Sequence, residues 1–247
     1  TDQSGTVPNT GYDRLNVTLN GTAQIKPYLR SEASFIYAKT SNQKGSKGAG
    51  SYLTNLLAWP INDDVTNYLN PDGTRRRITD NSATTEFDNP FWDVYNNLAE
   101  DENDRMVTNI GLIWDATPWL SFTGRVGYDV TAGNGYRSIH PQSNAGISQG
   151  GYIETYYNQA NVTTTNLFAT LKKSFGKFNT RLILGNAISE NEQTILSTQG
   201  SKFLEQNFLS INNTDPTTQR SQERIIRKKV VGFYGEAVFD YDNILFL

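Results

Sequence analysis

The chain has 247 residues, with 22 Lys and Arg, 25 Asp and Glu, one His and no Cys. The absence of cysteine excludes disulfides, thiolate nucleophiles and cysteine-ligated metal sites, and the net charge of −3 argues against a nucleic-acid binder. Hydrophobic residues make up only 36% of the chain while aromatic residues reach 12%, which is typical of a sheet with one apolar face and one polar face.

Alternation with a period of two is the main pattern along the chain, and it predicts β-strands. In the first strand, Leu15, Val17 and Leu19 share one face, whereas Arg14 and Asn16 share the other. The same pattern predicts strands over 12–24, 29–40, 105–115, 119–130, 161–173, 178–189 and 225–240, with an eighth beginning at Ile244. Because no segment has the pattern of a long amphipathic helix, we expect an all-β, antiparallel fold.

The connections between these strands alternate between short and long. The short ones lie at 25–28, 115–118, 174–177 and 240–243, and the long ones at 41–104, 131–160 and 190–223. Transmembrane β-barrels have this asymmetry, with short periplasmic turns and long extracellular loops, and their strands need about 9–11 tilted residues to span the bilayer. We therefore predict a segment of about seven or eight strands of a transmembrane β-barrel.

Aromatic residues flank the predicted short turns, as in the girdle of a barrel at a membrane interface. They are Tyr28, Trp114, Trp119, Phe175, Phe178 and Tyr241. The sequence stops inside its eighth predicted strand, and an open sheet edge cannot lie in lipid. We expect residues 1–247 to form one partial barrel domain, with the remaining strands outside this chain.

Four segments resemble the mid-barrel region of SusC/RagA-type TonB-dependent outer-membrane transporters: 7–17, 88–92, 119–129 and 233–241. The resemblance implies a larger barrel filled by a plug domain that is absent from this chain. It also implies import into the periplasm driven by TonB, and a SusD-like surface lipoprotein that captures a glycan or peptide ligand. The location implied is the outer membrane of a Gram-negative bacterium, which the chain would cross several times.

The long loop 41–104 is the best candidate for ligand contact. Trp59, Tyr68, Phe91 and Trp92 lie in it among Asn and Asp residues. Aromatic faces stack on sugar rings or peptide side chains, and nearby amides and carboxylates fix orientation. The alternative is that these four side chains form the small core that a loop of this length needs to be ordered.

Basic residues fall on both faces of the predicted wall. Arg14, Arg30, Arg125 and Arg181 lie on the polar faces, where we expect them to wet or crosslink the interior; the alternative is binding of plug carboxylates or an anionic substrate. Arg227 and Lys229 are in phase with apolar Val231 and Phe233, so contact with outer-membrane lipid and anionic lipopolysaccharide is predicted, with a solvated strand extension as the alternative.

No residue pattern indicates an enzyme, a cofactor or a metal site. The acidic run 100–104 lacks the spacing and the turn glycine of an EF-hand loop, and His140 has no visible nucleophile partner. Two other functions stay open. One is a small structural or adhesive outer-membrane barrel, and the other is a secreted β-sandwich binding module, in which the apolar stripes would be buried between two sheets.

Overall fold

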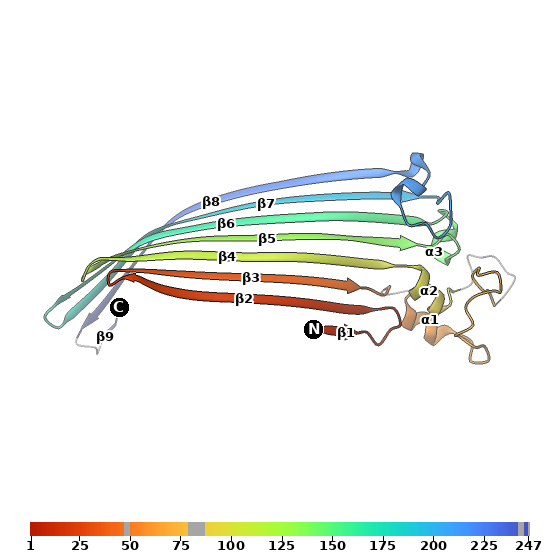
Figure 1. Ribbon diagram of the computed structural model, residues 1–247, viewed down its shortest axis with the longest axis horizontal. Helices are drawn as coiled ribbons and strands as arrows, with labels where there is room; N and C mark the ends of the chain where they lie inside the picture. The colour runs from red at the N-terminus through yellow and green to blue at the C-terminus, as the bar shows by residue number, and fades with distance from the viewer. Residues whose placement is uncertain (47–49, 79–86, 242–244, 247) are drawn as a thin grey trace.

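The computed structural model describes residues 1–46, 50–78, 87–241 and 245–246 (Figure 1). In this part of the chain nine strands form one sheet, and each strand pairs antiparallel with its neighbours in sequence. The strands are β1 (Asp2–Ser4), β2 (Gly11–Lys26), β3 (Leu29–Gln43), β4 (Ala99–Thr117), β5 (Leu120–Ile139), β6 (Tyr152–Phe175), β7 (Phe178–Ser201), β8 (Arg220–Tyr241) and β9 (Leu245–Phe246). The all-β prediction is confirmed.

Short helices occur in the long connections of the sheet. They are α1 (Tyr52–Ala58), α2 (Pro90–Asn96), α3 (Asn144–Ile147) and the 3-10 turns η1 (Ile211–Asn213) and η2 (Pro216–Thr218). No helix in the described residues combines the length and the apolar character that crossing a membrane requires.

Tight turns and long loops lie at opposite ends of the sheet, as predicted (Figure 1). Between β6 and β7 the turn has two residues, and the first, Gly176, has a φ of 61°. This left-handed conformation suits glycine, and its place at the first position of the turn is typical of a type II′ hairpin, whose twist matches that of the strands. The described parts of the long connections 44–98, 140–151 and 202–219 gather at the other end.

The strands extend further toward the long loops than the alternation predicts. β4 begins at Ala99 instead of 105, and β6 begins at Tyr152 instead of 161. The acidic run 100–104, expected at the end of a loop, therefore belongs to β4. In the β4 extension both faces are polar, so it carries no period of two. In the β6 extension Ile153 and the tyrosines do not follow a regular alternation. Backbone pairing continues in both extensions regardless of side-chain polarity.

The two ends of the chain also differ in detail from the prediction. Residues 1–11, which precede the first predicted strand, contain β1, which pairs with the start of β2. At the other end, the predicted start of the eighth strand, Ile244, lies outside the described residues, and the final paired strand is β9.

The register brings the apolar side chains of all long strands onto one face. Val17 pairs with Tyr37, Tyr37 pairs with Met106, and Met106 pairs with Val130. Further members of this apolar face are Leu19, Phe35, Ile110, Val126, Leu167, Leu184, Val231 and Phe233.

This apolar face is open to the surroundings. Ile110 is 60% exposed and Phe233 is 84% exposed. In the described residues no second sheet covers the apolar face, so its stripes are not buried between two sheets as the β-sandwich alternative requires. A contiguous exposed apolar surface of this extent marks an interaction with lipid or with another protein surface.

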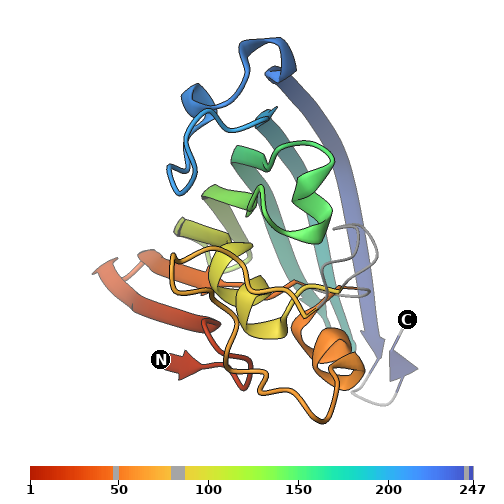
Figure 2. The same cartoon turned by 90° about the vertical axis from the view of Figure 1, so that its right-hand side faces the viewer.

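The opposite face is polar, and the sheet curves around it. A groove of about 710 Å³ on this face contacts every strand from β2 to β8, including Asn20, Glu32, Asn109, Arg125, Asn166 and Ser189. Figure 2 views the molecule from the loop end and shows the strands as a curved row, with the helices gathered at this end.

Candidate functional site

The polar face is crosslinked by ion pairs between strands. Arg105 Nη2 lies 2.6 Å from Asp129 Oδ2, and Arg181 Nη2 lies 2.9 Å from Glu236 Oε1. The ion pair between Arg125 Nε and Glu32 Oε1, at 2.7 Å, joins β5 to β3 across β4. Because these side chains stay partly exposed, the pairs contribute little to the stability of the fold. Their main effect is to link strands and to keep the groove polar and hydrated.

A glycine makes the long crosslink possible. A Cβ at Gly111 of β4 would lie 2.5 Å from Cγ of Glu32, closer than any real side-chain contact. The missing side chain therefore leaves the path along which Glu32 reaches Arg125. The predicted crosslinking role is thus realised at Arg125 and Arg181, while Arg14 donates to Asn16 Oδ1 on its own strand.

The helix α2 organises the loop end of the sheet. Asn89 caps its start by accepting from the backbone N–H of Phe91 and Trp92, and Pro90 occupies the first turn, both of which are typical of helix N-termini. The Asn89 Nδ2 atom also donates to Val65 O at 2.8 Å, so the cap ties α2 to the preceding part of the same loop.

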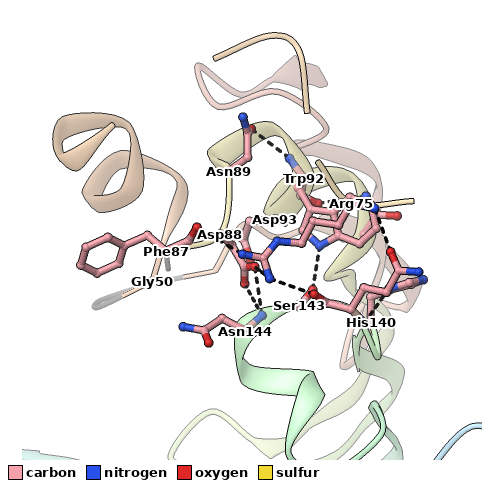
Figure 3. Close-up of polar contacts among 12 residues, drawn as sticks. Gly50, Arg75, Phe87, Asp88, Asn89, Trp92, Asp93, His140, Ser143 and Asn144 are labelled. Atoms are coloured by element: carbon pink, nitrogen blue, oxygen red, sulfur yellow. Dashed lines mark hydrogen bonds and ion pairs between the residues drawn. The ribbon is translucent and has the colours of Figure 1, made fainter. Parts of the chain in front are cut away.

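A buried ion pair within the first long loop also contacts the second long loop (Figure 3). Arg75 Nη1 lies 3.0 Å from Asp88 Oδ1, and both side chains are almost fully buried. Arg75 also donates from Nη1 to Gln142 O at 2.9 Å. Asp88 accepts from the backbone N–H of Asn144 at the start of α3, so its carboxylate is bound by groups of both loops.

Trp92 is the centre of this loop assembly. It is 2% exposed, its Nε1 donates to Ser143 Oγ at 2.9 Å, and Ser143 in turn donates to Asn97 Oδ1 at 2.8 Å. The His140 ring packs edge-on against it, with ring centroids 5.0 Å apart. In this structure Trp92 therefore holds the first two loops together.

His140 connects the second long loop to the third. Its Nε2 lies 3.1 Å from Asn207 Oδ1, and Gln142 Nε2 donates to Gln206 Oε1 at 3.1 Å. Burial lowers the pKa of His140, and the hydrogen bond to Asn207 opposes this. The described parts of the three long loops thus form one connected platform above the groove, which we call the loop platform (44–46, 50–78, 87–98, 140–151 and 202–219).

Two of the four predicted ligand-contact residues lie together on the loop platform. Tyr68 and Phe91 have near-parallel rings with centroids 6.3 Å apart. Tyr95 stacks on Tyr68 at 5.8 Å, and Tyr52 meets Phe91 edge-on at 5.7 Å. These four rings, which we call the aromatic cluster, are partly or largely open to solvent.

The other two predicted residues lie apart from this cluster. Trp59 is partly exposed and donates from Nε1 to Asp63 Oδ2 at 3.1 Å, while Trp92 is buried as described. Whether any of the four contacts a ligand stays a prediction.

A second cavity, of about 720 Å³, lies beneath the loop platform beside α2. Ser46, Asn55, Asp88, Asp93, Arg137 and Ser138 are among the residues that line it. Burial raises the pKa of Asp93 to about 6, although hydrogen bonds from Asn97 and Ser46 oppose the rise, and the charge of Asp88 adds to it. In the described part of the chain no group of three or more His, Cys, Asp or Glu side chains is arranged to hold a metal ion.

Sequence reasoning did not single out Arg75, Asp93 or Ser143. Asn89-Pro90 carried a usable signal, since a capping residue followed by proline predicts a helix start. Contacts such as that between Arg75 and Gln142 join residues 67 positions apart, and no local pattern encodes them.

The comparisons with known proteins agree on the architecture. No protein-family model and no curated protein sequence matches this chain. Among solved structures, the RagAB peptide importer in its closed-closed state matches with a TM-score of 0.78 at 14% sequence identity, over 99% of this chain and 28% of that chain. A second structure, of the RagAB peptide transporter, gives a TM-score of 0.76 at 14% identity, with the same coverage of both chains.

A more distant match is the siderophore receptor PiuA from Acinetobacter baumannii. Its TM-score is 0.51 at 15% identity, over 96% of this chain and 34% of that chain. This chain thus spans about a third or less of the chains it matches. At such identities the likeness establishes the fold, which is a segment of antiparallel β-barrel wall with its long loops.

Proposed function

We propose that this chain forms part of the wall and outer loops of a TonB-dependent importer in the outer membrane of a Gram-negative bacterium. The observation that carries the proposal is the two-faced sheet, with an exposed apolar face on one side and a polar, ion-paired groove on the other. In such a wall the apolar face meets lipid and the polar face lines the interior. The fold likeness to RagAB, a peptide importer, and PiuA, a siderophore receptor, supports it.

The role proposed for this chain is to let a polar solute pass and to select it, with no bond-breaking step. The groove supplies amide, hydroxyl and paired charged groups along the path, and such groups exchange hydrogen bonds with a polar solute in place of water. The loop platform, which contains the buried ion pair of Arg75 and Asp88, offers the aromatic cluster at the outer end.

The finer assignment is to the SusC/RagA type, with oligosaccharides or peptides as cargo. It is supported by the resemblance of segments such as 7–17 and 119–129 and by the fold likeness to RagAB. The proposed partners are TonB, acting through a plug outside this chain, and a SusD-like lipoprotein over the loop platform. For the lipoprotein the test is co-purification with the tagged parent protein from detergent-solubilised outer membranes.

Uptake by whole cells tests the transport proposal. Cells that express the parent protein are given fluorescent oligosaccharides and peptides, with and without a functional TonB. We expect accumulation of one class of cargo that disappears when TonB is deleted and when the parent gene is deleted. Recovery of the parent protein as a soluble species without detergent, or uptake that is unchanged without TonB, would contradict the proposal.

A further inference from the structure

The cavity beside α2 contains a carboxylate that the fold leaves incompletely satisfied. Asp93 is 3% exposed and lines this cavity. Its Oδ1 accepts from Asn97 Nδ2 at 2.7 Å and from Ser46 Oγ at 3.5 Å. Its Oδ2 is buried and has no hydrogen-bond partner, which is a costly arrangement for a carboxylate oxygen.

A second unsatisfied polar atom lies on the same cavity wall. The Oγ atom of Ser138, near the end of β5, is buried without a hydrogen-bond partner, and the residue is 2% exposed. Asp93 and Ser138 reach the cavity from different elements, α2 and β5. Two acceptor-bearing groups left open in one cavity indicate a ligand that donates hydrogen bonds.

The charges around the cavity indicate that this ligand is a cation. Asp88 is neutralised by Arg75, and Lys44 forms an ion pair with Asp101. Arg137 also lines the cavity, and it is exposed. Within the described residues Asp93 has no ion-pair partner. A buried carboxylate without a counter-charge attracts a cation that brings its own N–H donors.

An organic cation fits the few oxygen atoms available in this cavity better than a metal ion does. Calcium takes about six to eight oxygen ligands, and Asp88 already serves Arg75 and the backbone N–H of Asn144. The cavity volume of about 720 Å³ is within the range of about 300–1,000 Å³ that is typical of small-molecule sites. A compact ammonium group needs few oxygen partners.

We propose that this cavity binds a protonated primary amine, whose N–H groups donate to Asp93 Oδ2 and Ser138 Oγ. The amine can belong to the free N-terminus of a peptide or to an amino sugar, since both present the same ammonium group. Binding at this site does not depend on energy-driven transport, so its test is separate from the uptake test.

Matched ligand pairs test the requirement for an amine on the unmodified protein. Binding of triglycine and N-acetyl-triglycine, and of glucosamine and N-acetylglucosamine, is measured by calorimetry on the purified parent protein in detergent. We expect at least one free amine to bind, and its acetylated partner to bind at least tenfold more weakly. The pair that shows the difference identifies the source of the amine. Equal binding within both pairs, or binding by none of the four, overturns the proposal.

Two substitutions assign the effect to the cavity. Asp93→Asn keeps the size of the side chain and removes its charge, so affinity for the free amine should fall at least tenfold. Ser138→Ala should weaken it by a smaller factor, and Glu205→Gln, an exposed change in the third long loop, should leave it unchanged. An unaltered affinity in Asp93→Asn overturns the proposal. If that variant fails to fold, the comparison of free and acetylated ligands on the unmodified protein is the deciding test.

The pH dependence gives a separate readout. The charged groups that line the cavity with Asp93 are Asp88, Lys44 and Arg137, and α1 contributes none. Because the carboxylate must be ionised to bind the ammonium group, affinity in the unmodified protein should fall about tenfold per pH unit below about pH 6. Affinity for the amine that does not change between about pH 7.5 and about pH 5 contradicts the proposal.

Discussion

Arg75 and Asp88 form an ion pair whose side chains are only 3% and 9% exposed. Replacing Arg75 by Met leaves the carboxylate of Asp88 buried without its cation, which costs about 3–5 kcal/mol in comparable buried pairs. In Arg75→Met we expect the free energy of local opening of the loop platform to be lower by a similar amount. Hydrogen exchange of the backbone amides of 87–97 measures it.

The matched control for this prediction is Arg105→Met on the polar face of the wall. Its pair with Asp129 is much more exposed, so its loss should cost less than about 1 kcal/mol. Equal protection from exchange in Arg75→Met and in the unmodified protein would show that the buried pair does not hold the loops.

Asp93 makes the stability of the loop platform depend on pH. Burial raises its pKa from 3.8 to about 6, so the folded loops bind a proton more tightly than the unfolded chain. The stabilisation is therefore complete below about pH 4 and is lost as the pH rises through about 6, with an upper limit of about 3 kcal/mol. His140 acts in the opposite sense, because its pKa is lowered and its contribution is lost as the pH falls.

Comparison with Asp93→Asn separates these two effects. We expect the unmodified loops to lose more stability between about pH 4.5 and about pH 7.5 than the loops of the variant do. Urea unfolding followed by tryptophan fluorescence at both pH values measures the difference. Parallel pH profiles would mean that the pKa of Asp93 is not raised.

Tyr68 lies at the centre of the aromatic cluster, between Phe91 and Tyr95. If this cluster stacks on the cargo, Tyr68→Ala should weaken binding of the cargo identified by uptake about tenfold, since one aromatic contact is worth about 0.5–1.5 kcal/mol beyond its buried area. The control is Tyr157→Ala, on β6 outside the cluster. Equal affinities of the two variants in a binding titration would rule out Tyr68 as a contact.

At the scale of the elements, each long strand contributes one side to the exposed apolar face of the sheet and the other to the polar face with its groove. On β7, Leu184 belongs to the apolar face and Ser189 lines the groove. Lysine on the lipid face near the middle of a bilayer costs about 2–4 kcal/mol, and lysine facing the interior costs much less.

We therefore expect Leu184→Lys to be destabilised by about 2–4 kcal/mol relative to Ser189→Lys. Denaturant titration of the parent protein refolded into lipid vesicles measures both. Equal stabilities of the two variants would contradict the assignment of the faces.

The strands show how far alternation predicts structure. The apolar residues of β2 and β5, such as Val17 and Val126, alternate because one face of the sheet is apolar and the other is polar, and these strands were predicted. At the loop end of β4 both faces are polar, so residues such as Glu100 look like loop although they pair with Tyr136 of β5. Alternation reports a difference between two environments, and it disappears where the environments are alike.

The helices were missed for a different reason. α2 has seven residues, which is too short to display a helical period, and buried side chains such as Trp92 are covered by contacts with another loop. The sequence predicted the long first loop and its aromatic residues, but it could not predict that Trp92 would be buried against Ser143 and His140. Such contacts depend on how three separate loops pack, which no single segment encodes.

At the scale of the whole molecule, one curved sheet separates an apolar exterior from a polar interior, and the loop platform lies over one end. The platform is connected through contacts such as His140 with Asn207. The groove and the cavity beside α2 thus lie on a single framework, the first along the wall and the second beneath the loops.

Lipid accessibility of the two faces is the most direct test of this account. This chain contains no cysteine, so once any cysteines elsewhere in the parent protein are replaced, a Leu112→Cys or Asn109→Cys substitution on β4 places one spin label on one face or the other. In the parent protein reconstituted into vesicles, we predict that the label at 112 is relaxed by oxygen dissolved in the lipid and the label at 109 by a water-soluble nickel complex. The reverse pattern, or shielding of the label at 112 from both reagents, would contradict the account.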